Sequence, residues 1–304
     1  MSQPYAIFCS NPLEPRTAEP DFAAEAAAAR DAGFAIMLVD HDELERYRRP
    51  KAALRKAKIG EGGAAVYRGW MLRAGAYEGL HDTLLEQGVR LLTSPKDYEA
   101  CHHGPSSYAR LQAWTPRATW IAESELDDAE ALRAALAPFG SAAVILKDWV
   151  KSQAAGYWRE ACFIADASDA DAVDRVVSRF RALQGDSLTG GLYFKAYLDL
   201  QPTGSPAHEY RAFFLDGRVV GCWPRTAGAK ALPAPPASLL EAVAAAIPSP
   251  FAAADFGIDA TGRWWLLEVG DGQVSGLPDG AAGPVFAALA TAASGRGSGA
   301  ARSR

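Results

Sequence analysis

The sequence predicts two kinds of folded region, a small α/β domain followed by a larger α+β domain. Near the N-terminus, short apolar runs at residues 5–9 and 34–39 flank an Ala-rich helical segment at residues 21–32, which Gly33 ends. This strand–helix–strand order favours a parallel pair joined by a crossover helix. From about residue 116 the pattern changes to hairpins interspersed with helices, which is typical of an α+β region.

The domain boundaries follow from this change of pattern. We predict the α/β domain over residues 1–115, the α+β domain over residues 116–290 and a disordered, Gly-rich tail over residues 291–304. The other strands are expected at residues 64–70, 89–92, 142–150, 158–165, 192–200, 209–223 (with a turn at Asp216-Gly217), 253–259 and 263–269. The other helices are expected at residues 75–87, 125–139, 169–183 and 238–246.

The composition is that of an ordinary globular protein, with 304 residues and a net charge of −5 from 31 basic and 36 acidic side chains. Without a basic surplus, we expect neither nucleic-acid binding nor attachment to an anionic membrane. No apolar run reaches the roughly 18 residues of a membrane span, and the N-terminus lacks the basic region of a signal peptide. The four cysteines form no C-x-x-C pair, which fits reduced thiols. We therefore expect a cytoplasmic protein.

Three local patterns allow more than one interpretation. Cys101-His102-His103 has no second Cys/His cluster nearby, so we do not expect a metal site there. The basic run from Arg46 to Lys58, with seven cations, is more typical of a solvated helix face than of a nucleic-acid site. Arg68 and Arg73 lie near the end of a short strand and are candidates for substrate contact.

The most specific pattern is an acidic hairpin, AADFGIDATGRWWLLEVGDGQ, at residues 253–273. If Thr261-Gly262 forms a two-residue turn, Asp255 lies directly opposite Glu268. A four-residue loop would shift the pairing by two and keep both side chains on one face, whereas a three-residue loop would put them on opposite faces. Like charges about 5 Å apart need a proton, a cation or solvent between them. Mg²⁺, which is usually held by one or two carboxylates with phosphate oxygens and water, suits the pair. The alternative is a solvated acidic edge.

Asp255-Phe256-Gly257 also matches the metal-binding triplet of protein kinases, but the order of motifs excludes a kinase. No H-R-D catalytic loop precedes the triplet, and only 47 residues follow Gly257. The glycine cluster at residues 60–63 matches neither a P-loop nor a dinucleotide-binding fingerprint. A kinase and a Rossmann cofactor site are therefore both unsupported.

Four cations precede the acidic hairpin, each associated with an apolar strand. Lys147 ends one strand, Lys195 lies within the next, Arg211 begins a third and Arg225 follows it. Such a lysine needs a counter-charge, which a phosphate provides, although each cation taken alone is more often a snorkelling surface residue. Residues 152–156 are predicted to form a flexible hairpin tip that folds over phosphates.

This order of motifs resembles the ATP-grasp superfamily. The matching elements are a lysine on a strand, a flexible loop, a hinge strand, E-x-R-x-F-x-x-D-G-x-V-x-G, and D-x-x-x-D-x-x-G-x-W-x-x-x-E-V-x-x-G-Q. More narrowly, the chain is similar to the divergent clade set apart by two arginines and a lysine, which includes a eukaryotic assembly factor for translation initiation. The resemblance covers about residues 90–280. It implies an ATP-grasp fold, in which two α+β subdomains clamp ATP, preceded by the small α/β domain.

The resemblance also implies which residues bind the nucleotide. Lys147 would contact the α- and β-phosphate oxygens. The adenine would be flanked at the hinge by Lys195, Tyr197 and Leu198. Either Asp199 or Glu209 would hold the ribose, and the resemblance does not choose between them.

The remaining implied roles concern the metal and the transferred phosphate. Asp255 and Glu268 would bind Mg²⁺, while Arg211 and Arg225 would face the γ-phosphate and the acyl-phosphate that forms. Many members carry E-x-N at the end of the hairpin, but the asparagine is missing here, so Asp271 is a candidate replacement ligand.

The activity that the resemblance implies is ATP- and Mg²⁺-dependent ligation of a carboxylate to an amine through an acyl-phosphate. The acceptor would be a small molecule or a peptide or protein side chain. The alternative is an ATP-binding assembly factor with little or no turnover, in which tryptophans such as Trp70 and Trp120 belong to a partner surface.

Overall fold

The computed structural model describes residues 3–60, 62–150, 154–200, 209–225 and 233–299. The chain forms two compact units: unit 1 comprises Met1–Glu99, Glu209–Asp255 and Gly270–Arg304, and unit 2 comprises Ala100–His208 and Phe256–Val269. Each unit thus combines segments that are distant in sequence. The division of the chain into two continuous domains at residue 115 remains a sequence-based prediction. Within the described ranges, no helix is long and apolar enough to cross a membrane.

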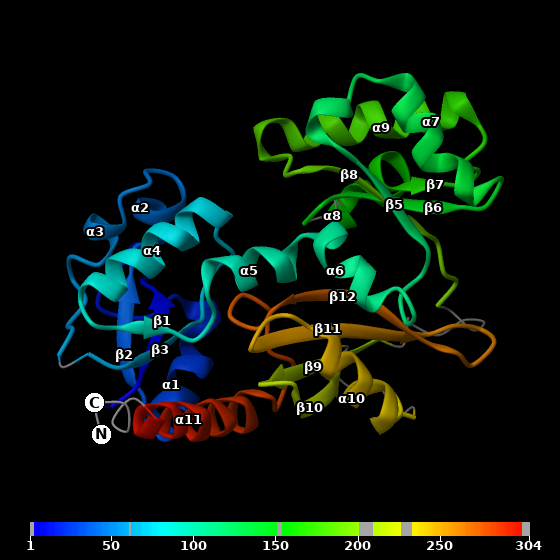
Figure 1. The fold of residues 1–304 in the computed structure, drawn as a ribbon. Helices are drawn as coiled ribbons and strands as arrows, with labels where there is room; N and C mark the ends of the chain where they lie inside the picture. The colour runs from blue at the N-terminus through cyan, green and yellow to red at the C-terminus, as the bar shows by residue number, and fades with distance from the viewer. Residues whose placement is uncertain (1–2, 61, 151–153, 201–208, 226–232, 300–304) are drawn as a thin grey trace. The chain divides into compact units, whose positions relative to one another are not determined.

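Unit 1 contains a four-stranded parallel sheet with the order β2-β1-β3-β4 (Figure 1). Its strands are β1 (Tyr5–Cys9), β2 (Ala35–Val39), β3 (Ala64–Tyr67) and β4 (Arg90–Leu91). The helical segments along this part of the chain are η1 (Pro20–Phe22), α1 (Ala23–Asp31), α2 (His41–Glu45), α3 (Pro50–Ala53), α4 (Ala74–Glu86) and α5 (Pro95–His102). The predicted parallel pair with its crossover helix is therefore confirmed, because β1 and β2 pair in parallel and α1 connects them.

A second sheet has the order β10-β9-β11-β12. Its strands are β9 (Glu209–Leu215), β10 (Arg218–Pro224), β11 (Phe251–Ile258) and β12 (Trp264–Asp271), and the nearby helices are α10 (Ala237–Ala246) and α11 (Ala282–Gly299). The predicted turn between β9 and β10 is confirmed: Asp216 and Gly217 both have positive φ angles, of 49° and 72°. Such a pair of left-handed residues is what a tight turn between twisted antiparallel strands requires.

The predicted disordered tail is wrong for residues 291–299, which continue α11. The helix begins in an apolar stretch whose Val285, Phe286 and Leu289 are buried in the core of unit 1. Packing of one helix face supplies the stability that the Gly-rich sequence lacks by itself, so the helix extends further than its composition predicts. Residues 300–304 lie outside the described ranges.

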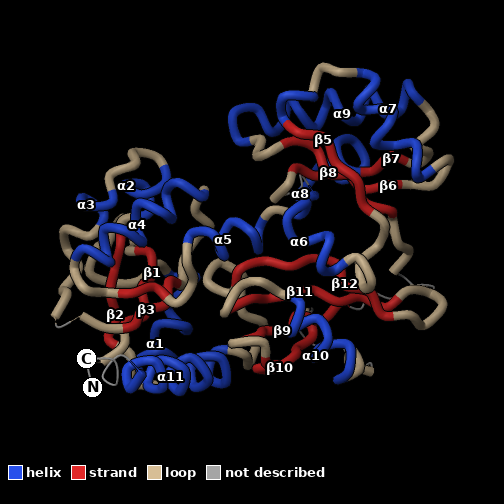
Figure 2. The backbone as a smooth tube through the Cα atoms, in the orientation of Figure 1, coloured by secondary structure: helices blue, strands red, loops and turns tan. Residues whose placement is uncertain are grey.

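Unit 2 is built on an antiparallel sheet with the order β5-β8-β6-β7 (Figure 2). Its strands are β5 (Ala118–Ala122), β6 (Val144–Asp148), β7 (Phe163–Ile164) and β8 (Gly191–Ala196). Its α-helices are α6 (Gly104–Leu111), α7 (Ala129–Leu136), α8 (Ala154–Tyr157) and α9 (Ala170–Gln184). Other helical turns are η2 (Glu123–Glu125), η3 (Ala137–Phe139), η4 (Trp158–Cys162) and η5 (Gly185–Ser187).

Helices α7 and α9 cover one face of this sheet (Figure 2). Val144, Leu146 and Phe194 point to that face and are buried with Val176 and Phe180 of α9. Because side chains alternate along a strand, the residues that alternate with these three on β6 and β8 belong to the opposite face. The core of unit 2 therefore decides which residues of β6 and β8 remain available for a ligand.

Two predictions for this unit are wrong in detail. The predicted strand at 158–165 is reduced to β7, because Trp158–Cys162 forms a π-helical turn instead. The predicted hairpin tip at 152–156 is replaced from Ala154 onward by the short helix α8, while residues 151–153 lie outside the described ranges. Helices α5 and α6 were not predicted, because the Pro95 and Gly104-Pro105 signals favour a break.

The hairpin of β11 and β12 closes through a three-residue loop, so the predicted two-residue turn is wrong. The backbone N–H of Asp259 donates to the carbonyl of Arg263 at 3.0 Å, and Gly262 adopts a positive φ of 85°. At the open end of the same hairpin, Gly272 N donates to Phe251 O at 2.9 Å. These two bonds differ by one residue in register, so an irregularity lies between them, and loop length alone does not fix which face Asp255 and Glu268 share.

A buried ion pair joins two segments of unit 1. Arg68, which is 1% exposed, donates two hydrogen bonds to Glu25, both at 2.8 Å. The same guanidinium donates to the carbonyls of Gly272 and Ser275. Arg68 therefore fixes α1 and the chain after β12 to the end of β3, and its predicted contact with a substrate is wrong. Arg73 lies at the surface, where it pairs with Glu45 at 3.1 Å.

We expect Glu25→Ala to lower the free energy of unfolding by about 3–5 kcal/mol, because it leaves a buried guanidinium without its counter-charge. Chemical denaturation measures the loss. The matched control is Glu43→Ala, which removes an equally bidentate but exposed partner of Arg49 and should cost less than about 1 kcal/mol. Equal losses in the two variants would contradict the structural role given to the buried pair.

Candidate functional site

The register of β6 and β8 places two predicted lysines on one face of the unit 2 sheet. Lys147 lies opposite Tyr193, and Lys195 lies opposite Ile145. Since Val144, Leu146 and Phe194 occupy the face covered by α7 and α9, Lys147, Tyr193 and Lys195 share the other one. The sequence brings the lysines together because each strand carries a lysine at an odd-numbered position, while the even-numbered positions Val144, Leu146, Leu192 and Phe194 carry buried apolar side chains.

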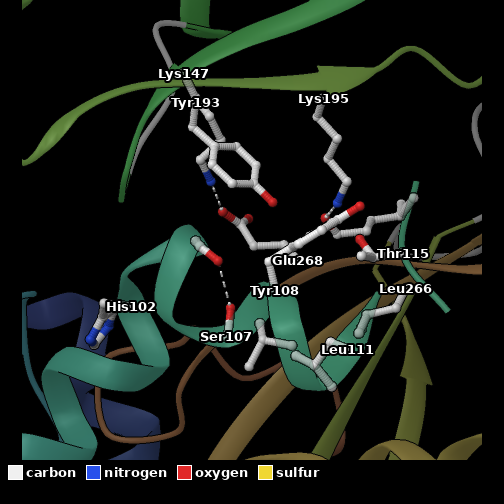
Figure 3. A pocket seen from close by; sticks show the side chains of 13 residues that line it. His102, Ser107, Tyr108, Leu111, Thr115, Lys147, Tyr193, Lys195, Leu266 and Glu268 are labelled. Atoms are coloured by element: carbon white, nitrogen blue, oxygen red, sulfur yellow. Dashed lines mark hydrogen bonds and ion pairs between the residues drawn. The ribbon is translucent and has the colours of Figure 1, made fainter. Parts of the chain in front are cut away.

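Both lysine ammonium groups point into one hollow and are held by residues of β12 (Figure 3). Lys147 Nζ lies 2.7 Å from Glu268 Oε1, and the Lys147 side chain is 18% exposed while that of Glu268 is 50% exposed. Lys195 Nζ donates to the carbonyl oxygen of Leu267 at 2.6 Å. The hollow thus contains two cations and one half-exposed carboxylate.

The charge balance of this hollow is reflected in the pKa of Lys195. The pKa of Lys195 is lowered from 10.5 to about 7: burial is the main cause, the positive charge of Lys147 adds to it, and the carboxylate of Glu268 partly opposes both effects. One carboxylate is therefore not enough to keep both ammonium groups fully charged at neutral pH. A ligand that brings negative charge would restore the balance.

The walls of the hollow include residues that the sequence analysis missed. It has a volume of about 460 Å³, including solvent at its mouth, and α6 contributes Ser107, Tyr108 and Leu111 to it (Figure 3). Tyr193 forms the opposite wall, its ring stacks 6.1 Å from that of Trp120, and burial raises its pKa well above its ordinary value. Tyr193 could have been found from the sequence, since it lies two residues before Lys195 and so shares its face.

The other predicted nucleotide-binding residues follow β8 directly. Tyr197 N donates to Ala143 O at 2.9 Å, and its 40% exposed ring packs edge-on against Phe163 at 5.1 Å. Leu198 is half-buried and Asp199 is exposed. Residues 201–208, which follow, lie outside the described ranges. The proposed adenine and ribose contacts of this segment therefore remain predictions.

The two predicted arginines lie in unit 1, where they surround Asp255. Arg211 donates to both oxygens of Asp255, through Nε at 2.7 Å and Nη2 at 2.8 Å, and Arg225 Nη1 adds a third bond at 2.9 Å. Arg225 Nη1 also lies 3.0 Å from Glu209 Oε2. Asp255 is 3% exposed and the guanidinium groups compensate its charge, while its role as a magnesium ligand remains a prediction.

Asp271, the third predicted metal ligand, is fully buried in unit 1. It accepts hydrogen bonds from Ser249 Oγ at 2.8 Å and from Gln273 N at 3.0 Å. Burial raises the pKa of Asp271 to about 6, although these hydrogen bonds oppose the shift. Gln273 in turn donates to Tyr77 Oη and accepts from Tyr67 N. Asp271 therefore anchors the chain after β12 in a polar network that occupies both of its oxygens.

In the part of the chain that the structure describes, no group of three or more His, Cys, Asp or Glu side chains has the arrangement of a metal site. Glu268 is the predicted ligand with substantial exposure. Because Mg²⁺ is often held by one or two carboxylates together with phosphate oxygens and water, Glu268 fits one position of such a site when a nucleotide supplies others.

Several solved structures share this fold over nearly the whole chain. The D-cycloserine synthetase DcsG is 16% identical with a TM-score of 0.60, and the match covers 95% of this chain and 99% of that one. A RimK domain ATP-grasp protein from Sphaerobacter thermophilus DSM 20745 is 16% identical with a TM-score of 0.61, over 94% and 98%. The ATP-grasp ligase PsnB, solved with a minimal precursor, is 15% identical with a TM-score of 0.56, over 97% and 99%. These matches confirm the predicted α+β ATP-grasp fold.

The sequence itself identifies the family. Residues 138–291, just over half of the chain, match the model of an ATP-grasp domain, namely family 3 of the clade named for two arginines and a lysine. The chain belongs to this family, which confirms the predicted membership of the ATP-grasp superfamily. A comparison with curated proteins found no significant match.

We expect the unusual state of Lys195 to appear in the pH dependence of stability. Its pKa is about 7 in the folded protein and close to 10.5 in the unfolded chain, so the unfolded chain binds more protons between these values. The free energy of unfolding should therefore rise with pH from about 7 to 10. Lys195→Met should lack this part of the rise in chemical denaturation at several pH values. Parallel pH profiles for the two proteins would contradict the assignment.

Proposed function

We propose that this protein is an ATP- and Mg²⁺-dependent ligase that joins a carboxylate to an amine through an acyl-phosphate. The observation that carries the proposal is the hollow in which Lys147, Lys195 and Glu268 converge within an ATP-grasp domain. Two ammonium groups and one carboxylate form a pattern suited to the phosphates of a nucleotide and one bound cation. The folds of DcsG and PsnB, whose names describe a synthetase and a ligase, are consistent with it.

Lys147 and Lys195 would bind the nucleotide in this hollow. An ammonium group in a partly buried site gains most from a ligand that supplies negative charge, and polyphosphate does so with several acceptor oxygens. Binding would raise the pKa of Lys195 back towards its ordinary value. The aromatic rings of Tyr193 and Tyr108 would exclude water from one side of the hollow.

Glu268 would hold Mg²⁺, which supplies charge neutralisation of the phosphates when it is bound. In the structure Glu268 pairs with Lys147, so the two residues would exchange this mutual bond for the ion and the phosphate. Asp255 and Asp271, the other predicted ligands, already accept hydrogen bonds from Arg211 and Ser249, respectively, whereas Glu268 is half-exposed. Glu268 is for this reason the ligand we test.

The reaction would proceed in two displacements. A carboxylate oxygen of the substrate attacks the γ-phosphorus, the bond to the β-phosphate oxygen breaks, and ADP leaves. The amine then attacks the carbonyl carbon of the acyl-phosphate, phosphate leaves, and the amide nitrogen loses a proton. The lysines would stabilise charge on the phosphates by position rather than by covalent chemistry. The proposal retains the predicted role of Arg211 and Arg225, which is to face the phosphate that is transferred.

The substrates would be a small carboxylic acid and either a small amine or a peptide. The solved relatives include both kinds of protein: DcsG is named as a D-cycloserine synthetase, and PsnB was solved with a minimal precursor. The alternative function, an ATP-binding assembly factor with little turnover, is favoured by exposed aromatic side chains such as Trp70, which is 41% exposed, and Trp120, which is 39% exposed.

Turnover distinguishes these two functions. With ATP, Mg²⁺ and panels of carboxylic acids and amines, a ligase should release ADP and phosphate only when both substrates are present. Lys147→Ala should weaken ATP binding by about 1.5–3 kcal/mol, the scale of a hydrogen bond to a charged group, and should reduce turnover in parallel. ATP binding without ADP release across the panels favours the assembly factor. Unchanged ATP affinity in Lys147→Ala, measured by calorimetry, removes Lys147 from the site.

We expect the effect of Glu268→Gln on ATP affinity to have opposite signs without and with Mg²⁺. Without Mg²⁺, the variant should bind ATP more tightly than the wild type, because the lost carboxylate repels phosphate and competes for Lys147. With Mg²⁺, the variant should bind roughly tenfold more weakly, or about 1.4 kcal/mol, because the ion loses a ligand. Calorimetry with and without Mg²⁺ measures both affinities.

The control for this experiment is Asp259→Asn in the hairpin loop. Partial burial opposes a low pKa at Asp259, but hydrogen bonds from Thr261, Trp265 and Arg263 hold it at about 2, so this carboxylate serves the turn. Its substitution should leave the Mg²⁺ response unchanged. A loss of that response equal to the loss in Glu268→Gln would mean that the hairpin as a whole, and not Glu268, governs metal binding.

A further inference from the structure

A second hollow lies in unit 1 and shares no residue with the hollow of unit 2. Its volume is about 430 Å³, including solvent at its mouth, and its lining includes Ser10, Leu38, Asp40, Arg55 and Lys56. Ser10 directly follows β1, and Asp40 directly follows β2. The hollow is therefore at the carboxyl ends of two adjacent parallel strands, which is the edge where open α/β sheets bind ligands.

Two cations at the rim of this hollow are held in place without an ion pair. Arg55 and Lys56 are exposed, and among the described residues neither forms a salt bridge. They occupy a turn after α3 in which Arg55 N donates to Ala52 O at 3.1 Å and Ala57 N donates to Leu54 O at 2.9 Å. Leu54 is 5% exposed, so its burial anchors the turn and keeps both cations beside the hollow.

The two carboxylates that also line the hollow are engaged elsewhere to different degrees. Both oxygens of Glu43 accept from Arg49, at 2.7 and 2.9 Å, which compensates its charge. The carboxylate of Asp40 accepts one hydrogen bond, from Glu43 N at 3.1 Å, and so caps α2. The hollow consequently offers two cations, the hydroxyl of Ser10 and one carboxylate that has bonding capacity left.

We propose that this hollow binds a small molecule that carries a phosphate or carboxylate group beside a hydroxyl group. The anionic group is held by Arg55 and Lys56, and the hydroxyl donates to Asp40. The apolar floor formed by Leu38 and Ala53 suits a short carbon chain between the two. The surplus of cations in the segment from Arg46 to Lys58 adds a long-range attraction for anions on a chain whose net charge is −5.

Calorimetry with sn-glycerol 3-phosphate and with glycerate tests the proposal. Each probe carries hydroxyl groups beside its anionic group. Because one anionic group is a phosphate and the other a carboxylate, comparing the two affinities shows which of them the hollow recognises. The titrations use the full chain with Lys147→Ala, so that the lysine hollow of unit 2 contributes little to the signal. At least one probe should bind saturably, and Arg55→Gln/Lys56→Gln should weaken its binding at least tenfold.

A charge-matched variant in the same unit separates a site from general electrostatic attraction. Arg90→Gln/Lys96→Gln removes two cations that are outside the hollow, and it should leave the affinity within twofold. Circular dichroism confirms that both double variants remain folded. Absence of saturable binding by either probe overturns the proposal, as does an equal loss, or no loss, in the two double variants. Because Lys147 is absent throughout, these outcomes are independent of nucleotide binding.

Discussion

The constraint on which the unit 2 site depends is that two ammonium groups face one partly buried hollow with a single carboxylate between them. The core of the unit imposes this arrangement, because α7 and α9 take the apolar positions of β6 and β8 and leave Lys147 and Lys195 on the free face. Glu268 compensates one charge at 2.7 Å, and the pKa of Lys195 is still lowered, mainly by burial and also by the charge of Lys147. A ligand rich in negative charge would relieve this imbalance, which is the basis of the proposal that the hollow binds a nucleotide.

Unit 1 handles buried charge by the opposite means. Asp255 is compensated by full positive charges, since Arg211 and Arg225 together donate three hydrogen bonds to it and Arg225 also pairs with Glu209. Asp271 is instead stabilised by a hydroxyl and a backbone amide, which carry no charge, and burial raises its pKa to about 6. Arg68 is matched by Glu25 and two backbone carbonyls. Carboxylates that look equivalent in the acidic hairpin therefore differ strongly in their surroundings.

The sequence predicted most of the strands, the parallel N-terminal strand pair and the lysines of the hollow, because each depends on a local pattern of apolar and polar residues. It did not predict features that depend on tertiary packing or on a loop length that differs by a single residue. The helix α11 runs past residue 291 because Phe286 is buried against the core, which composition does not reveal. The β11–β12 loop has three residues instead of two, and such a difference changes the parity of every pairing that follows it. The partners of Asp255 come from positions 30 and 44 residues away in the sequence, and no local pattern specifies such contacts.

The choice of cation also differs between the two units, and the difference has a chemical consequence. A guanidinium stays charged at any physiological pH and binds a carboxylate with two parallel hydrogen bonds, which suits the fixed cluster around Asp255. An ammonium is a compact charge whose pKa shifts readily when it is buried, which is the behaviour of Lys195. Charge in the arginine cluster is therefore insensitive to pH, whereas charge in the lysine hollow changes near neutrality. If a nucleotide binds in this hollow, its phosphates favour the protonated form of Lys195, so a proton comes to Lys195 either with the nucleotide or from solution. The number of protons taken up on binding at about pH 8 therefore reports whether the phosphates lie beside that ammonium group.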